Sequence, residues 1–281
     1  MKKINFFDLF LWIVRRNEKD VINLYDSLSD LMQIATGGNM LNFGYWEDDI
    51  TVPLEAQKKM CEIFAEKAQL NSNQKIIDVG SGLGEPALLW VSKYNPVILS
   101  CININFKQLK NSKNNQNDSL NFFNSTATTL PFANKSVDRV IALESAQHFK
   151  PLKNFISESF RILKKDGILA LAIPVMVSNH VFPMMKLGSL SMTWSSERYS
   201  IDFVKSTINQ TGFKILSFEK IGSNVYEPLA NYYFKNRYSI KQKISEHYPS
   251  YVEKILFKSL HKMKESSEKK IIDYIFVICR K

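Results

Sequence analysis

Cysteine is scarce in this sequence and follows no pattern. The three cysteines of the 281 residues have separations that match neither paired disulfides nor a metal-binding motif; they are Cys61, Cys101 and Cys279. Two of them fall in apolar runs typical of strands, where a free thiol packs as a small apolar side chain. The sequence therefore predicts three free core thiols, which suit a reducing cytoplasm, and no metal site.

Long apolar runs are also missing. No stretch approaches the roughly 18 uninterrupted apolar residues that a membrane-spanning helix needs. The segment 1–14 begins with lysines and is largely apolar, but Asp8 interrupts it and no small-residue cleavage site follows. We therefore expect neither a spanning helix nor a secretion signal, and we expect a cytoplasmic location.

Acidic residues are too few to balance the basic ones, and the excess is local. The formal net charge is +10, and the segment 235–270 holds ten Lys or Arg against four Glu, a net of +6. Apolar residues at helical spacing favour a solvated helical surface over a small core. The alternative is a basic surface that attracts an anionic substrate or an acidic membrane, giving a peripheral membrane contact. Nucleic acid is not an expected partner, because no recognisable nucleic-acid-binding module is present.

Glycine is infrequent, yet three of the ten glycines fall within five residues, at Gly80, Gly82 and Gly84. They follow the apolar run 75–79, which is typical of a buried parallel strand, and precede Pro86, which fits the first turn of a helix. Glycines let the backbone turn tightly and approach a ligand without a side-chain clash. This pattern predicts a turn that binds a nucleoside cofactor.

The same turn does not suit a pyrophosphate, because Glu85 would place a carboxylate at the helix N-terminus. Its spacing, Asp-x-Gly-x-Gly-x-Gly from Asp78, resembles the first motif of the class I S-adenosylmethionine (SAM) dependent methyltransferases. The resemblance implies that SAM is the cofactor and that Asp78, Gly80 and Gly82 take part in binding it.

Two further segments follow the order of that family. Asn103 lies 23 residues after Gly80, about where a βαβ unit carries its ribose-binding residue, with Asn105 as a second candidate. The family usually has an acid there, and an amide oxygen accepts a ribose hydroxyl more weakly than a carboxylate does. The segment 125–132 resembles the adenine-binding segment, with Thr126 in place of a common aspartate. A backbone contact near Ala127 is therefore expected.

The strand predicted at 137–144 ends in Glu144 and is followed by His148. In an open α/β sheet, ligands bind outside the carboxyl ends of the strands where the strand order reverses, here after the strands at 75–79 and 138–143. Leu143 is assigned to the cofactor by resemblance. His148 titrates near neutrality and is the best candidate base. Glu144 could orient the acceptor or hold a cation. The competing interpretations are a structural histidine and a helix-capping carboxylate.

The segment 42–46 resembles a Gly-Tyr-Trp segment that precedes the core in a subgroup including natural-product, sugar and lipid methyltransferases. This resemblance implies that Tyr45 and Trp46 close over the sulfonium, whose positive charge favours aromatic faces. Ordinary core packing is the competing explanation for both rings.

The alternation of apolar patterns predicts an α/β fold: a doubly wound, mostly parallel seven-stranded Rossmann-like sheet with a helical cap. Residues 1–50 form a helical arm in this prediction, and residues 51–222 form the SAM-binding core. Residues 223–270 are an insertion too long for a plain loop and are expected to form the cap. Residues 271–281 resemble the family's terminal antiparallel strand.

The resemblance implies a SAM-dependent methyltransferase that acts on a small-molecule or lipid-like acceptor. The alternatives are a membrane-lipid or quinone methyltransferase and a catalytically inactive SAM-binding interaction module. Methyl transfer is an in-line displacement that needs alignment and exclusion of water, with a base only where the acceptor keeps its proton late. Carbon, nitrogen and oxygen acceptors all fit this chemistry.

Overall fold

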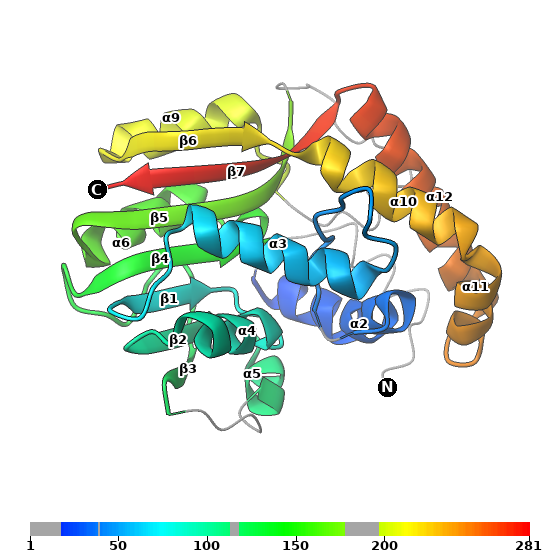
Figure 1. Cartoon of the computed structure of the whole chain (residues 1–281), viewed down its shortest axis with the longest axis horizontal. Helices are drawn as coiled ribbons and strands as arrows, with labels where there is room; N and C mark the ends of the chain where they lie inside the picture. Colours follow the sequence, from blue (N-terminus) through cyan, green and yellow to red (C-terminus); the bar gives the residue numbers. More distant parts are fainter. Residues whose placement is uncertain (1–17, 39, 113–117, 178–196) are drawn as a thin grey trace.

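A computed structural model describes residues 18–38, 40–112, 118–177 and 197–281 (Figure 1). The first 17 residues of the predicted arm lie outside the described residues, as does most of the asparagine-rich loop at 111–117. Among the described residues, no helix is long and apolar enough to cross a membrane.

Seven strands form one sheet in the order β3-β2-β1-β4-β5-β7-β6. The strands are β1 (Lys75–Val79), β2 (Ile98–Asn103), β3 (Leu120–Asn124), β4 (Val137–Leu143), β5 (Leu163–Met176), β6 (Lys214–Lys220) and β7 (Ile272–Arg280). Neighbours among β1 to β5 pair in parallel, whereas β7 runs antiparallel to both β5 and β6. The prediction of a mostly parallel, seven-stranded sheet is confirmed. The strand order reverses between β1 and β4, which places the ligand crevice at their carboxyl ends.

Helices cover both faces of the sheet (Figure 1). The helices of the core are α3 (Pro53–Lys67), α4 (Glu85–Tyr94), α5 (Phe106–Ser112), α6 (Leu152–Ile162) and α9 (Ile201–Thr211). Ile76 packs in the core cluster with α3 and α4, while the next residue, Ile77, packs in the cluster with α6 and α9. Successive strand residues point to opposite faces, so β1 is apolar throughout because both faces are covered.

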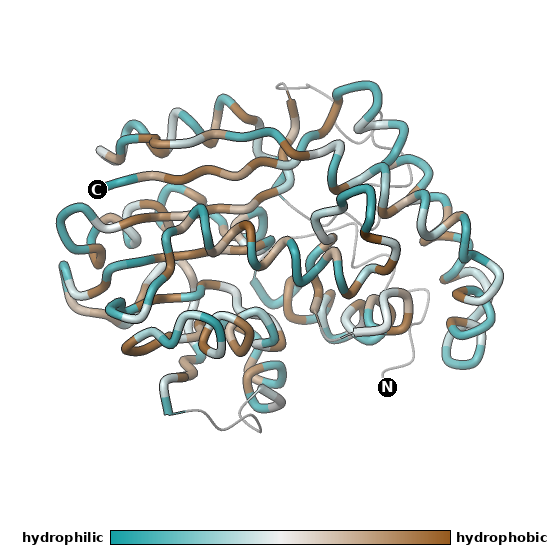
Figure 2. The backbone as a smooth tube through the Cα atoms, in the orientation of Figure 1, coloured by the Kyte–Doolittle hydropathy of each residue, from teal (hydrophilic) through white to brown (hydrophobic). Residues whose placement is uncertain are grey.

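Three helices occupy the insertion between β6 and β7: α10 (Tyr226–Lys235), α11 (Arg237–Ser245) and α12 (Ser250–Glu268). Their apolar side chains pack against α2 (Glu18–Thr36) in a third cluster that includes Leu24, Leu31 and Val252. In Figure 2 the strands are largely brown, whereas the cap helices alternate between brown and teal. This alternation reflects helices with one apolar face and one solvated face.

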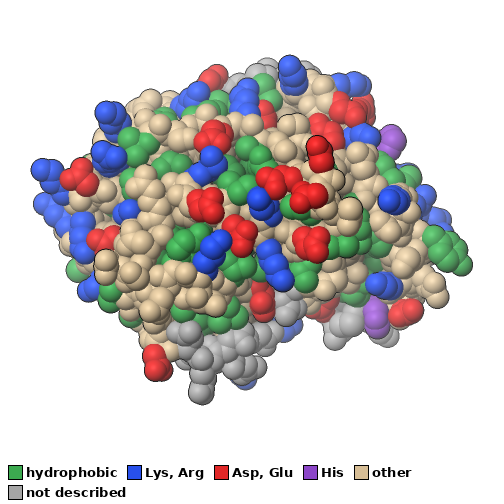
Figure 3. Space-filling model, viewed as in Figure 1, with side chains coloured by type: hydrophobic (Ala, Val, Ile, Leu, Met, Phe, Trp, Pro, Cys, Tyr) green, Lys and Arg blue, Asp and Glu red, His purple; other side chains and the backbone are tan. Residues whose placement is uncertain are grey.

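Several basic side chains of the cap form ion pairs within it. Arg237 lies 2.8 Å from the carboxylate of Glu253, which is fully buried and also accepts from the hydroxyl of Tyr233. Lys262 and Lys269 both contact Glu265. Figure 3 shows acidic and basic side chains interspersed on the face that carries α3. These ion pairs reduce the unpaired positive charge of the segment 235–270, and its choice between a solvated surface and a binding surface stays a prediction.

Candidate active site

A cavity that opens to solvent lies at the carboxyl ends of β1, β2 and β4. The glycine turn forms one wall, and α2 covers the cavity with Glu18, Val21, Ile22 and Tyr25. Five of the predicted cofactor residues line it: Gly80, Gly82, Asn103, Ala127 and Leu143. The two predicted catalytic residues, Glu144 and His148, line the same cavity.

The three glycines of the turn have different surroundings. Gly80 has φ +80°, and a Cβ there would clash with the side chain of Ser145, so this glycine lets the turn pack against the end of β4. Gly82 has φ +56°, and the nearest atom to a Cβ there would be Leu41 Cδ1 at 3.9 Å. Gly82 therefore exposes backbone to the cavity, which is the arrangement a closely approaching ligand requires.

Asn103 is buried, and its side chain forms hydrogen bonds with three neighbouring residues. Its Nδ2 donates to the carbonyl of Gly82 at 3.0 Å and to Gln108 Oε1 at 2.9 Å, and its Oδ1 accepts from the backbone N–H of Asn105. A carboxylate has no donor for the Gly82 carbonyl. Asparagine in place of the usual acid therefore fixes the glycine turn, and its amide oxygen, which accepts one hydrogen bond, keeps a second lone pair.

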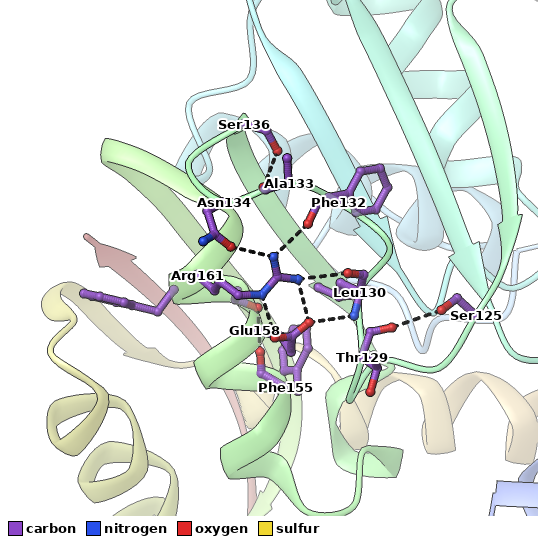
Figure 4. A network of polar contacts seen from close by, with 12 residues as sticks. Ser125, Thr129, Leu130, Phe132, Ala133, Asn134, Ser136, Phe155, Glu158 and Arg161 are labelled. Atoms are coloured by element: carbon purple, nitrogen blue, oxygen red, sulfur yellow. Dashed lines mark hydrogen bonds and ion pairs between the residues drawn. The ribbon is translucent and has the colours of Figure 1, made fainter.

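The segment 125–132 is held in place by an arginine network (Figure 4). Arg161 donates to the carbonyls of Leu130 at 2.9 Å and Phe132 at 2.7 Å, and Glu158 accepts from the backbone N–H of Leu130. Arg161 also pairs with Glu158 at 2.7 Å. These contacts position Ala127 at the cavity wall.

Thr126 and Asp78 lie beside the cavity and not among its lining residues. The hydroxyl of Thr126 donates to the carboxylate of Glu18 on α2. Asp78 is buried in β1 directly before the turn, and burial raises the pKa of its carboxyl to about 7. Thr126 therefore helps to hold the covering helix, and Asp78 is a buried carboxyl directly before the glycine turn.

Tyr45 and Trp46 are placed away from the cavity. Trp46 is buried, donates through Nε1 to the carbonyl of Phe43, and packs 5.7 Å from the ring of Tyr232 in the cap. Tyr45 packs against the core on the α3 side of the sheet. From the same segment, Asn42 lines the cavity instead.

Glu144 lines the cavity and is tied to two other segments. It has φ +51°, and its Oε1 accepts from the backbone N–H of Phe43 at 2.9 Å and from the hydroxyl of Tyr274 at 3.0 Å. Burial raises the pKa of this carboxyl to about 8, despite the two donors that lower it. Glu144 is thus a partly protonated group at neutral pH that ties the 42–46 segment to the sheet.

This raised pKa predicts a pH-dependent effect of Glu144→Gln on stability. Between pH 4.5 and about 8 the folded state holds a proton that the unfolded carboxyl releases, so the free energy of unfolding falls as pH rises. Glutamine keeps an oxygen for the two donors and cannot ionise. Urea unfolding should show the variant gaining about 4 kcal/mol relative to wild type between pH 5 and pH 9. Glu55→Gln, at an exposed site on α3, should show no such change between the two pH values. If the free energy of unfolding of Glu144→Gln differs from that of wild type by the same amount at pH 5 and pH 9, the assignment is refuted.

His148 pairs with a tyrosine that is not among the residues predicted from the sequence. Its Nε2 lies 2.8 Å from the hydroxyl of Tyr25, and the two rings meet edge to face with centroids 5.4 Å apart. His148 sits on a 3₁₀ turn, η1 (Ala146–His148), after β4, whereas Tyr25 comes from α2. The contact joins residues 123 positions apart, and no local pattern marks it.

Helix α2 is fastened over the cavity by further polar contacts. Asp26 accepts from Asn105 Nδ2 at 2.9 Å, and Ser29 lies 3.2 Å from Gln108 Nε2. With the Glu18 and Tyr25 contacts, the covering helix is held at four points along its length. Helix α2 thus covers part of the cavity, and group transfer requires a site from which water is excluded.

Metal chemistry has no candidate ligands in the described part of the chain, where no three His, Cys, Asp or Glu side chains are grouped to hold a metal ion. The three cysteines are buried and free.

Residues 77–171 match a family model described as a methyltransferase domain. Over 269 residues the chain is 26% identical to erythromycin 3''-O-methyltransferase of Saccharopolyspora erythraea, covering 90% of this chain and 88% of that protein. It is 32% identical to 27-O-demethylrifamycin SV methyltransferase of Amycolatopsis mediterranei over 152 residues, which are 52% of this chain and 55% of that relative.

Among solved structures, mycolic acid cyclopropane synthase CmaA1, solved with SAH and CTAB, superposes with a TM-score of 0.81 at 19% identity, covering 95% of this chain and 99% of that one. At this identity the likeness establishes the fold. The family-model match begins within β1 and includes the glycine turn, Asn103 and the end of β4, which line the cavity; the covering helix α2 lies outside it.

Proposed function

Because the chain belongs to the class I SAM-dependent methyltransferases, we propose that it methylates an oxygen of a small-molecule or lipid-like acceptor. The observation that carries this proposal is the meeting of the glycine turn and the His148–Tyr25 pair in one covered cavity. Its similarity to two O-methyltransferases over half or more of its length favours oxygen over carbon or nitrogen.

The residues of the cavity suit SAM. The open side of Gly82 leaves backbone exposed for a close approach, Asn103 offers an amide oxygen for a ribose hydroxyl, and Ala127 supplies a small wall for a purine. When bound, SAM supplies an electrophilic methyl group on a sulfonium. The lining residues at the end of β4 and directly after it, from Leu143 to Ser145, would face that end of the cofactor.

His148 and Tyr25 would handle the acceptor proton. The Tyr25 hydroxyl takes the proton of the acceptor hydroxyl and passes its own proton to His148 Nε2. The acceptor oxygen thus loses its proton while it forms the new C–O bond and the C–S bond of the sulfonium breaks. Tyr25 also fixes the orientation of the imidazole. This arrangement gives the pair a role that an inactive SAM-binding module would not need.

A cytoplasmic location and a peripheral membrane contact complete the proposal. Lys241, Lys243 and Lys254 are exposed on the cap, and Tyr238 near the start of α11 is 87% exposed. Exposed lysines near an aromatic ring suit the interface of an anionic membrane.

Calorimetry with SAM and with NAD tests the cofactor, and transfer of a labelled methyl group to alcohols, amines and lipids tests the reaction. We expect SAM to bind with a dissociation constant in roughly the micromolar range, NAD not to bind, and alcohols to be methylated. NAD binding without SAM binding would contradict the cofactor proposal. SAM binding without turnover on any acceptor class would instead favour the interaction-module alternative, and turnover on membrane lipid or quinone alone would favour the second enzyme alternative.

A further inference from the structure

A second cavity, of about 1050 Å³, lies between α2 and the cap helices. Its walls include Leu28 and Leu31 of α2, Leu229 of α10, and Leu256 and Met263 of α12. No charged side chain of the described residues lines it. Its walls are apolar enough that a ligand would be held by burial of hydrocarbon surface.

Most polar side chains around this cavity already have hydrogen-bond partners in the protein. The hydroxyl of Tyr226 donates to the carbonyl of Asp273 at 3.1 Å, and that of Tyr233 lies 3.1 Å from Glu253. Thr36 donates to the carbonyl of Met32, and Asn42 Oδ1 accepts from the backbone N–H of Gly44. A charged ligand group placed here would lose its hydration without gaining partners, which is strongly unfavourable.

The second cavity adjoins the first. Asn42 lines both cavities. Phe43 lines the second cavity, and its backbone N–H donates to Glu144, which lines the first. On α2, Tyr25 lines the first cavity and Leu28 the second. Residues three apart on a helix are neighbours on one face, with a rise of about 4.5 Å between them. A single molecule could therefore reach from one cavity to the other along α2.

We propose that the second cavity holds the apolar body of the methyl acceptor, an elongated, uncharged, hydrocarbon-rich molecule whose nucleophilic end lies at His148 and Tyr25. This inference rests on the methyl-transfer function proposed above and specifies its substrate class. It assigns the cap a direct role, since α10 and α12 supply most of the walls, and it gives α2 a double role as cover of one cavity and wall of the other.

Binding of the uncharged dye Nile red to the full chain tests the second cavity directly. Leu229→Trp and Leu256→Trp, both at half-buried positions on the wall, should fill it and weaken Nile red binding at least tenfold, with SAM binding by calorimetry unchanged. The matched control is Leu216→Trp on β6, an exposed site that does not line the cavity. Unchanged dye affinity in both filled variants would overturn the proposal, as would displacement of the dye by SAM.

A competition on the wild-type chain needs no variant. 1-Decanol should displace Nile red, whereas decanoate at pH 8 should do so at least tenfold more weakly, because its carboxylate finds no partner in the cavity. Equal competition by the two would overturn the uncharged character of the ligand. Dye binding with this selectivity in a protein that does not bind SAM would leave the second cavity standing and refute the methyl-transfer function.

Discussion

Gly82→Leu should abolish SAM binding while the protein stays folded. The Cβ of residue 82 would project into the first cavity, where the nearest protein atom is Leu41 Cδ1 at 3.9 Å. A leucine side chain would therefore occupy space that the cofactor needs and would meet little protein. We expect the affinity for SAM, measured by calorimetry, to fall by roughly a hundredfold or more, the effect of losing about 3 kcal/mol of binding free energy.

Backbone strain alone must be separated from loss of the binding space, since residue 82 has a positive φ. Gly37, after the end of α2, provides the matched control: its φ is +78°, and a Cβ there would meet nothing within 4 Å. Gly37→Leu should carry a similar backbone cost of about 1–2 kcal/mol and bind SAM as wild type does. If both variants lose SAM binding equally, or if Gly82→Leu retains it, Gly82 does not face the cofactor.

The sheet and the glycine turn could be predicted because their signals are local. An apolar run such as 75–79 followed by closely spaced glycines and a proline permits few structures, and the structure has a buried parallel strand, a turn with positive φ values and a helix there. The position of the crevice then follows from the strand order, which brings Gly80 of one strand end beside Ser145 of another.

The contacts that complete the site could not be predicted, because they join distant parts of the chain. Tyr25 meets His148 only once α2 lies over the sheet, and Phe43 meets Glu144 only once the segment before α3 crosses the end of β4. An alternating or helical pattern shows which face of an element is buried, but not which residue of another element it meets. The same reason explains why the role of Asn103 in holding the Gly82 carbonyl was not visible in the sequence.

The rings of Tyr45 and Trp46 illustrate a second kind of difference. The motif resemblance predicts that they cover the sulfonium, whereas the structure packs Trp46 on Tyr232 of the cap. The cap lies almost 180 residues further along the chain, and its helices offer the aromatic partner that the 42–46 segment packs against. A position of these two rings near the sulfonium stays a prediction. From the same segment, Asn42 lines both cavities and Phe43 lines the second.

His148→Ala should reduce the maximal rate of methyl transfer about a hundredfold or more and leave SAM affinity nearly unchanged. His148 Nε2 lies 2.8 Å from the hydroxyl of Tyr25, and both residues line the cavity. The loss of the imidazole therefore removes the group that takes the proton and leaves the glycine turn intact. The pH profile of kcat should lose its acid limb, because that limb reports protonation of the imidazole.

Tyr25→Phe separates proton transfer from packing at the same pair. Phenylalanine keeps the edge-to-face ring contact, which has centroids 5.4 Å apart, and removes the hydroxyl. Because the two residues act as a unit, the double variant should be about as slow as His148→Ala alone and not slower by the product of the two effects. His261→Ala, at an exposed site on α12, is the control and should match wild type in rate and pH profile. A full rate and an intact acid limb in His148→Ala would assign the histidine to structure, and would indicate an acceptor that reacts without a base, such as an unprotonated amine.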